Sequence, residues 1–320
     1  MFNPNMPYRS LGRCGLKLSS FSLGGWTTFG GTVKDFTSIR SILRLAYEAG
    51  INFFDIADIY AKGESERMMG AALKDFPRHE LVISSKVFWP MSDDINDKGL
   101  SRKHVLESVN KSLQRIGTDY LDIYYCHRYD PETPVEETVR IMDDLIHHGK
   151  ILYWGTSEWT AEQIQEAMDV CDEGGYYRPQ VEQPQYSLLA REKFETNVQP
   201  KALEHGMGLT TWSPLASGML TGKYDDGVSE GRLSRIEWLK DTFYTDKNVQ
   251  RVRDMKKIAD DMECTRGQLA IAWLAAQSGI TSVILGATSI EQLQENLGAM
   301  KVNITTEVDL ELKKLFDYQL

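Results

Sequence analysis

The sequence lacks the usual marks of a metal site, a disulfide framework, a secretory signal and a membrane span. Its four cysteines, Cys14, Cys126, Cys171 and Cys264, lie far apart without a C-x-x-C pair, which is typical of a reducing cytosol. There is no His-x-His or H-E-x-x-H spacing, so we expect no bound metal. No basic segment followed by an apolar one opens the chain, and no apolar run could span a bilayer. We therefore expect a cytoplasmic protein that does not insert into membranes.

Positive charge is also scarce. Lysine and arginine number 36 against 46 aspartates and glutamates, which gives a net charge of -10 and a pI near 5.2. A nucleic-acid partner is excluded as the main ligand because it requires a basic face. A small phosphate-bearing ligand is not excluded, since a few local cations and backbone amides can hold it. No G-x-G-x-x-G motif follows any apolar run, so the usual sign of a Rossmann site is missing.

What the sequence does contain is a regular alternation of short β-like runs with amphipathic helical segments. Eight such runs occur: SFSLGGW (20–26), NFFDIAD (52–58), ELVISSKVF (80–88), YLDIYYCH (120–127), LYWGTSE (152–158), PQVEQPQY (179–186), GLTTWSP (208–214) and TSVILGA (281–287). Eight strands that are each followed by a helix predict an α/β protein with a parallel sheet, and the number favours a closed (β/α)₈ TIM barrel. We expect residues 1–320 to form a single domain of this kind.

Two features depart from the simple alternation. A short N-terminal β-hairpin is predicted over residues 8–18, turning near 12–15, and a long loop from Ser217 to about Lys247 follows the seventh strand. Helix starts are marked by a hydroxyl residue followed three positions later by an amide or carboxylate. These predicted capping boxes begin at Thr133, Thr160, Thr265 and Ser289. Gly50, Gly117 and Gly149 fall where helices should end.

In a (β/α)₈ barrel the chemistry lies at the carboxyl ends of the strands. The run NFFDIADIY (52–60) ends the second strand with Asp55, Asp58 and Tyr60, and buried carboxylates need partners, so we expect a polar pocket there. The third strand ends in Lys86 and the fourth in His127. These side chains should therefore meet at one end of the barrel.

Asp55, Tyr60, Lys86 and His127 make a coherent chemical group. An ammonium beside the phenol should lower its pKa from about 10, and a carboxylate behind the ammonium keeps it charged and in place. The imidazole can orient a substrate oxygen. Such a group can protonate an oxyanion as it forms at a carbonyl, and with a hydride arriving from the other side the reaction is carbonyl reduction.

Each residue alone has a simpler interpretation. Lys86 could be an ordinary ion-paired lysine with Asp55 as its structural partner, and Tyr60 could serve packing. His127 could be a core histidine or a metal ligand, but a metal-dependent barrel hydrolase or lyase is disfavoured because the lysine would repel the cation. The expected position of all four at the ends of neighbouring strands favours the catalytic interpretation.

Nearly the whole chain resembles the aldo-keto reductase superfamily, most strongly the branch containing the β subunits of voltage-gated potassium channels. The resemblance runs from LGGWTTFGG (23–31) to ILGATSIEQLQENLGA (284–299) and includes FDIADIY, SSKVFW, GLSRKH, DPETPVEETVR, YWGTSEW, EQPQYSLLAREK and TWSPLASGMLTGKYD. It implies NADPH-dependent reduction of small aldehydes or ketones, with the four residues above as a catalytic tetrad and Tyr60 as proton donor. The alternative is an NADPH-binding, redox-sensing subunit of a membrane channel with little turnover. Homo-oligomerisation, as a tetramer, is a further implication.

The resemblance also implies cofactor-binding positions. Those expected near the nicotinamide are Trp26, Ser157 and Gln183; the pyrophosphate loop comprises Trp212, Ser213, Pro214, Leu215, Ala216, Gly218 and Lys223; and the adenosine end comprises Gly286, Thr288, Gln292, Glu295 and Asn296. Arg232 is expected to reach a phosphate, with Arg235 as the alternative. The helix that begins after Thr288 favours an anion at its N-terminus, although capping alone would also explain these residues.

Three aromatic residues just beyond strand ends, Trp26, Trp89 and Tyr129, are predicted to wall an apolar substrate pocket, unless they are core aromatics. The chain departs from the channel β subunits at two notable positions. His127 stands where that branch has asparagine, which favours a working enzyme over a sensor. Glu158 stands where it has arginine, which leaves the polar rim of the cofactor cleft open to question. Ile56 and Ala61 replace threonine and glycine, with little expected consequence.

Overall fold

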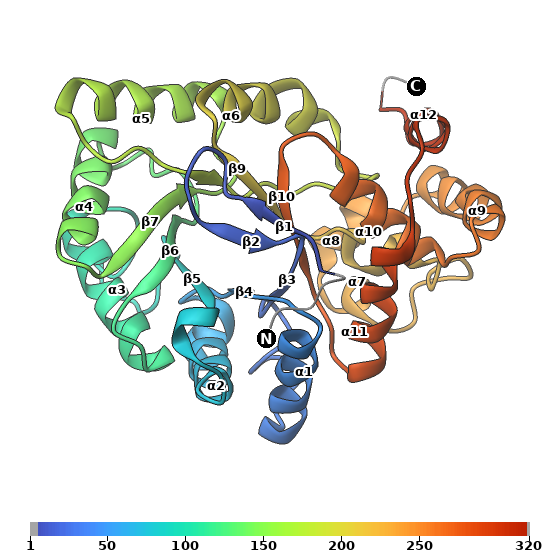
Figure 1. Ribbon diagram of the computed structural model, residues 1–320, viewed down its shortest axis with the longest axis horizontal. Helices are drawn as coiled ribbons and strands as arrows, with labels where there is room; N and C mark the ends of the chain where they lie inside the picture. Colours follow the sequence, from blue (N-terminus) through green and yellow to red (C-terminus); the bar gives the residue numbers. More distant parts are fainter. Residues whose placement is uncertain (1–5, 319–320) are drawn as a thin grey trace.

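The computed structural model describes residues 6–318, and its centre is a closed barrel of parallel strands (Figure 1). The strands follow one another around the barrel in the order β10-β3-β4-β5-β6-β7-β8-β9. Their bounds are β3 Phe21–Gly24, β4 Phe53–Asp55, β5 Val82–Val87, β6 Leu121–Cys126, β7 Ile151–Thr156, β8 Val181–Glu182, β9 Gly208–Thr211 and β10 Ile280–Leu285. All eight lie within the predicted runs or overlap them closely, so the (β/α)₈ prediction is confirmed.

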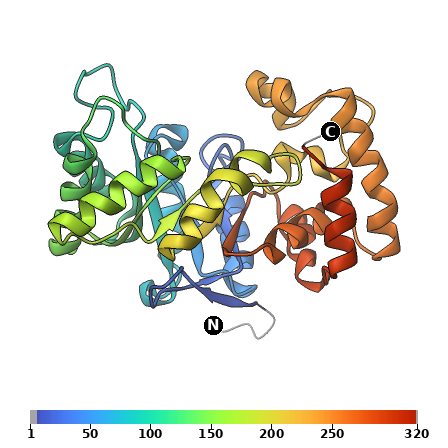
Figure 2. The same ribbon diagram turned by 90° about the horizontal axis from the view of Figure 1, so that it is seen from above.

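The predicted N-terminal hairpin is present and covers one end of the barrel. Its strands β1 (Tyr8–Ser10) and β2 (Lys17–Ser19) pair antiparallel. Leu11 and Leu18 are fully buried and join Phe53, Val82 and Ile123 in an apolar cluster inside the barrel. Figure 2 shows the hairpin at one end of the barrel and long loops at the opposite end. Because the hairpin seals the amino ends of the strands, the carboxyl ends remain for a functional cavity.

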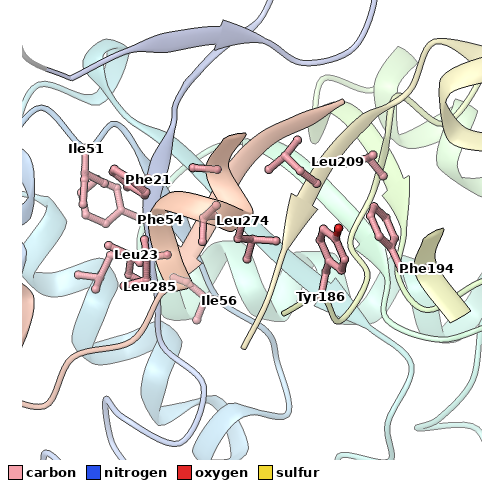
Figure 3. Packing of buried hydrophobic residues seen from close by; sticks show 14 of the residues in the cluster. Phe21, Leu23, Ile51, Phe54, Ile56, Tyr186, Phe194, Leu209, Leu274 and Leu285 are labelled. Carbon is pink, nitrogen blue, oxygen red and sulfur yellow. The ribbon is translucent and has the colours of Figure 1, made fainter. Parts of the chain in front are cut away.

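Helices surround the barrel on all sides (Figure 1). They are α1 Phe36–Glu48, α2 Glu64–Leu73, α3 Arg102–Ile116, α4 Val135–His147, α5 Ala161–Gly174, α6 Gln199–His205, α9 Asp246–Asp261, α10 Arg266–Ala276, α11 Ile290–Leu297 and α12 Thr306–Leu315. The main core lies between them and the strands, where residues such as Phe21, Leu23, Phe54 and Leu285 pack together (Figure 3). Within residues 6–318, no helix is both long enough and apolar enough to cross a membrane.

Two of the four predicted capping boxes form with both reciprocal bonds, at Thr160 and at Thr265. The prediction at Thr133 is wrong, because Pro134 occupies the cap of α4 and the Thr133 hydroxyl donates instead to Asp130 Oδ2 at 2.8 Å. Ser289 caps α11 through the backbone N–H of Gln292. The Gln292 side chain, however, accepts from the backbone and hydroxyl of Thr288 at 2.9 Å each, so this box is only half formed.

The long connection after β9 is more ordered than a loop. It contains a 3₁₀ segment, η4 (Ala216–Thr221). The short helices α7 (Arg232–Arg235) and α8 (Glu237–Phe243) follow before α9 begins. Leu233, Leu239 and Phe243 are buried and anchor these helices against the rest of the molecule. The apolar residues within a polar stretch were too sparse to predict helices, but they suffice to hold this segment in place.

Candidate active site

The centre of the candidate site is a buried ion pair between neighbouring strands. Lys86 on β5 is completely buried, and its Nζ donates to Asp55 Oδ2 and to the Ile56 carbonyl oxygen at 2.7 Å each and to the Tyr60 hydroxyl at 3.2 Å. The three N–H bonds of the ammonium are therefore all used. Such a pair is stable in a core only when its remaining polar atoms are also satisfied.

Asp55 meets that condition. Its Oδ1 atom accepts a hydrogen bond from Ser84 Oγ at 2.7 Å and another from Gln183 Nε2 at 3.0 Å. Ser84 is the partner of Asp55 in the β4–β5 ladder, so the sheet register itself places the hydroxyl beside the carboxylate. The ion pair is thus held in one geometry from three strands of the barrel.

The ionisation of this group differs in one respect from the sequence-based expectation. Burial alone would lower the pKa of Lys86, but the charges and hydrogen bonds of Asp55 and Tyr60 outweigh it and the pKa is raised. For Tyr60 the largest influence is burial, which raises the pKa, and the opposing effect of Lys86 does not overcome it. The expectation of a lowered phenol pKa was wrong because desolvation was left out of it. Tyr60 therefore carries its proton at neutral pH.

His127 follows β6 and faces Tyr60, with ring centroids 5.7 Å apart and an interplanar angle of 77°. Its pKa lies well below the ordinary value because the ring is buried and because Lys86 and Arg128 are close by. Nδ1 is buried without a hydrogen-bond partner among the described residues. A neutral imidazole has one N–H donor. It could therefore donate a hydrogen bond to a substrate oxygen in the cavity.

These side chains border a cavity of about 810 Å³ at the carboxyl ends of the strands. Asp55, Tyr60 and His127 line it, whereas Lys86 lies behind them. Fifteen further residues that the sequence analysis placed at the cofactor also line it: Trp26, Ser157, Gln183, Trp212, Ser213, Pro214, Leu215, Gly218, Lys223, Arg232, Gly286, Thr288, Gln292, Glu295 and Asn296. Ala216, the first residue of η4, is fully buried and does not line the cavity.

The three predicted aromatic walls do not all reach the cavity. Trp26 and Trp89 line it, and Trp26 packs edge-on against Trp212 with the ring centroids 5.5 Å apart. Tyr129 lies outside the lining, where it packs against Trp159 at 5.0 Å and its hydroxyl donates to Glu166. The prediction for Tyr129 is corrected: its ring and hydroxyl are engaged with Trp159 and Glu166, although Arg128, one residue earlier, lines the cavity.

Several cavity residues were not foreseen. They include Thr27, Thr28, Thr32, Ile59, Arg128, Ser217 and Trp238. Arg128 directly follows His127, so extending the strand-end rule by one residue would have found it. Trp238 belongs to α8, which the sequence did not predict.

Two loops meet over the cavity mouth. Arg235 Nη1 donates to Thr32 Oγ1 at 3.2 Å, and the Arg232 guanidinium lies 5.3 Å from the Trp26 ring. Glu158, by contrast, is not part of the lining. It accepts a hydrogen bond from Trp212 Nε1 at 3.1 Å and pairs with Lys193, so its carboxylate braces the cavity wall from behind.

The end of the cavity away from Tyr60 presents groups that suit a phosphate-bearing cofactor. Ser217 Oγ is buried without a hydrogen-bond partner among the described residues. Gly218 has a φ of +91°, a conformation that favours glycine, and the Lys223 side chain lies directly beside this backbone. Across residues 6–318, no carboxylate lies within 4.0 Å of the charged groups of Lys223 or Arg232. The set of donors therefore fits an anion. In the same part of the chain, no cluster of three His, Cys, Asp or Glu side chains could hold a metal ion.

Asp58 was expected in the pocket but faces the opposite way. It is fully buried against α3, where Oδ2 accepts from Ser108 Oγ at 2.8 Å and Oδ1 accepts from the Ile59 N–H at 2.6 Å. Burial, and then the charge of Glu66, raise the pKa of Asp58 to about 7. Because this pKa exceeds 3.8, the ordinary value for an aspartate, the carboxyl contributes stability that is complete below pH 3.8 and is lost as the pH rises through about 7.

We therefore expect Asp58→Asn to gain stability relative to the wild type as the pH rises. The asparagine can still accept from the Ile59 N–H, but it has no charge to bury. Between pH 4 and pH 8 the difference in unfolding free energy should move in favour of the variant by up to about 4 kcal/mol. Urea unfolding at a series of pH values measures it, with the exposed Asp94→Asn as control. A difference that is the same at both ends of this range would contradict the prediction.

The parallel barrel and the buried group at the carboxyl ends of its strands define a class of protein. The sequence profile of the Aldo/keto reductase family matches residues 20–316, which span the barrel from just before β3 to just after α12, and the chain belongs to this family. Within the family it is similar to an Arabidopsis thaliana protein named a probable voltage-gated potassium channel subunit beta, with 47% identity over 93% of this chain and 92% of that protein. An Oryza sativa subsp. japonica protein of the same name is 46% identical over 93% of this chain and 92% of its own length. A Schizosaccharomyces pombe protein, provisionally given the same subunit name, is 43% identical over 98% of this chain and 94% of its own.

Proposed function

We propose that the protein is an NADPH-dependent reductase of small aldehydes and ketones, with Tyr60 as the proton donor. The observation that carries this proposal is the completely buried Lys86, held between the Asp55 carboxylate and the Tyr60 hydroxyl at the wall of the cavity. Membership of the aldo/keto reductase family supports an oxidoreductase in general. The particular substrate, cofactor and residue roles are our inference from the site.

In the proposed mechanism the side chains of the protein protonate the carbonyl oxygen and stabilise the negative charge that forms. NADPH, when bound, supplies the hydride that reduces the carbonyl carbon. Tyr60 gives its hydroxyl proton to the carbonyl oxygen, so the oxygen leaves as an alcohol and the phenol becomes a phenolate. The Lys86 ammonium, 3.2 Å from that oxygen, stabilises the phenolate until a proton returns from solvent. Neutral His127 would donate its N–H to the carbonyl oxygen and hold it toward Tyr60.

The residues that would hold NADPH fall into the groups expected from the sequence. Ser157 and Gln183 lie beside Asp55, where Ser157 Oγ donates to the Gln183 carbonyl at 2.8 Å, and they would position the nicotinamide. Ser217, Lys223 and Arg232 would meet phosphate oxygens. The N-terminus of α11, capped by Ser289, would lie at the adenosine end. We also place the protein in the cytoplasm, in keeping with four unpaired cysteines.

A second candidate function is that of an NADPH-binding regulatory subunit of a membrane channel, assembled as a tetramer. The names of the relatives from Arabidopsis, rice and fission yeast favour it. The imidazole of His127 favours the enzyme, because it completes the proton-donating group. Co-purification of a membrane partner with negligible turnover on any aldehyde would favour the regulatory function.

The deciding experiment is steady-state oxidation of NADPH, and separately of NADH, with 4-nitrobenzaldehyde. Tyr60→Phe should lower kcat by at least about 10²-fold, because it removes only the proton that the reaction needs. Cofactor fluorescence should show NADPH binding within about 2-fold of the wild type, since the ring and its packing remain. Turnover by the variant close to that of the wild type would show that Tyr60 is not the proton donor. Binding without turnover across an aldehyde and ketone panel would favour the regulatory function instead.

A further inference from the structure

The substrate end of the cavity contains a cation that the proposed mechanism does not use. Arg128 immediately follows His127, is half-buried and lines the cavity. One of its terminal nitrogens, Nη1, donates to the His127 carbonyl oxygen and lies 3.5 Å from Ser157 Oγ. The guanidinium carbon is 5.8 Å from the centre of the Trp89 ring. The side chain is therefore held by its first nitrogen and by an aromatic face.

Among residues 6–318, Arg128 has no acidic partner. Within the part of the chain that the structure describes, no carboxylate oxygen lies within 4.0 Å of its nitrogens. Two other arginines with little exposure do have such a partner: Arg78 pairs with Asp122 at 2.7 Å and Arg191 with Glu195 at 2.9 Å. A half-buried charge without a counter-ion loses hydration and gains little in return. The free edge of the guanidinium is thus available to an anion that enters the cavity.

The position of Arg128 points to the substrate rather than to the phosphates of the cofactor. Its guanidinium carbon is 5.8 Å from the centre of the Trp89 ring, and that ring centre is 6.4 Å from the centre of the His127 ring, so the charge lies close to the reacting group. The cations that fit phosphates, Lys223 and Arg232, belong to the connection after β9. The acidic residue nearest to the reacting group, Asp55, is already neutralised by Lys86 at 2.7 Å. The substrate end is therefore positively charged overall.

We propose that Arg128 selects carbonyl substrates that carry a carboxylate, with the guanidinium binding the carboxylate while Tyr60 and His127 hold the carbonyl oxygen. This inference rests on the proposed function and specifies its substrate class. A planar guanidinium presents parallel N–H donors whose geometry matches a carboxylate, and its single charge balances a monoanion. The indole of Trp89, which also lines the cavity, would pack against the apolar or aromatic spacer between the two groups.

The test compares matched substrates that differ only in charge. These are 4-formylbenzoate with its methyl ester, and the 3-formyl isomers of both, measured as kcat/KM with NADPH. For the wild type we expect the better acid to exceed its ester by about 10- to 100-fold, the range for hydrogen bonds to a charged group. In Arg128→Gln this ratio should approach one, mainly through KM of the acid, and Arg128→Lys should retain part of it. Arg140→Gln, at an exposed arginine on α4 that does not line the cavity, should leave the ratio unchanged.

A binding measurement separates this inference from the proposed function. Calorimetric titration of 4-(hydroxymethyl)benzoate and of its methyl ester into protein saturated with NADP⁺ needs no turnover. Tighter binding of the acid that is lost in Arg128→Gln supports the inference even if no aldehyde is reduced, in which case only the reductase proposal fails. Reduction of aldehydes with equal kcat/KM for acid and ester would leave the reductase standing and overturn the role of Arg128. An acid preference that persists in Arg128→Gln would overturn it as well.

Discussion

Lys86→Met is expected to reduce turnover of an activated aldehyde by about 10³-fold or more. Methionine has a similar length and fills the buried space, but it cannot stabilise the phenolate that forms when Tyr60 gives up its proton. The loss should therefore fall on kcat, with NADPH binding close to that of the wild type. Steady-state kinetics and cofactor fluorescence on the same preparation measure the two effects. Turnover within 10-fold of the wild type would contradict the mechanism.

This substitution also leaves Asp55 buried without its ion-pair partner, and loss of stability could be mistaken for loss of chemistry. The double variant Lys86→Met with Asp55→Asn removes the orphaned charge and separates the two effects. An amide in place of the carboxylate can still accept from Ser84 Oγ, which lies 2.7 Å from Asp55 Oδ1. We expect the double variant to unfold at a higher urea concentration than the single one. Its activity should stay as low, because the ammonium is still missing.

The barrel and the position of the candidate site were predictable because both follow from periodic features. The spacing of apolar residues predicts the alternation of strands and helices, and the carboxyl ends of parallel strands meet at one end of a barrel. Asp55, Lys86 and His127 all sit at such ends, so their meeting could be inferred without coordinates. Tyr60 lies five residues beyond Asp55, close enough that the short turn could not carry it far.

The direction of individual side chains was not predictable to the same degree. Asp58 lies beyond the end of β4, where strand alternation no longer applies, and it turned toward α3. Tyr129 and Arg128 are adjacent in a loop, yet only Arg128 lines the cavity. The pKa of Tyr60 depends on the depth of burial, which a sequence does not contain. Chain segments outside regular elements, and the solvent exposure of polar groups, are where the structure was needed.

The turn that follows Tyr60 has an unusual backbone conformation that must be supported by neighbouring side chains. Ala61 and Lys62, the residues after Tyr60, have φ values of 49° and 52°, and Gly63 follows at 89°. Side chains other than glycine adopt this left-handed region at some cost, so surrounding contacts must hold it. A Cβ on Gly63 would lie 2.7 Å from Arg115 Cδ, which shows that the arginine packs directly against the turn. Arg115 therefore supports the turn three residues after Tyr60.

Arg115 is also the cation of a buried ion pair with Glu66. Glu66 has no solvent exposure, accepts from Ser85 Oγ at 2.6 Å and is bonded to Arg115 Nε. Burial and the charge of Glu66 raise the pKa of Asp58, and the same guanidinium opposes that rise, so a single cation acts on two buried carboxyl groups. Removing one member of such an arrangement leaves charge in the core without compensation.

We therefore expect Arg115→Met to lower the free energy of unfolding at pH 8 by about 3 to 5 kcal/mol. The loss should be smaller at pH 5.5, because Asp58, whose pKa in the folded protein is raised to about 7, then carries a proton and buries no charge. Urea unfolding at both pH values measures the effect, and Arg115→Met combined with Glu66→Gln should recover much of the loss at pH 8. Arg67→Met, at an exposed arginine on α2, is the matched control. A loss below 1 kcal/mol at pH 8, or a larger loss at pH 5.5, would show that Arg115 does not hold the buried charges that lie behind Tyr60.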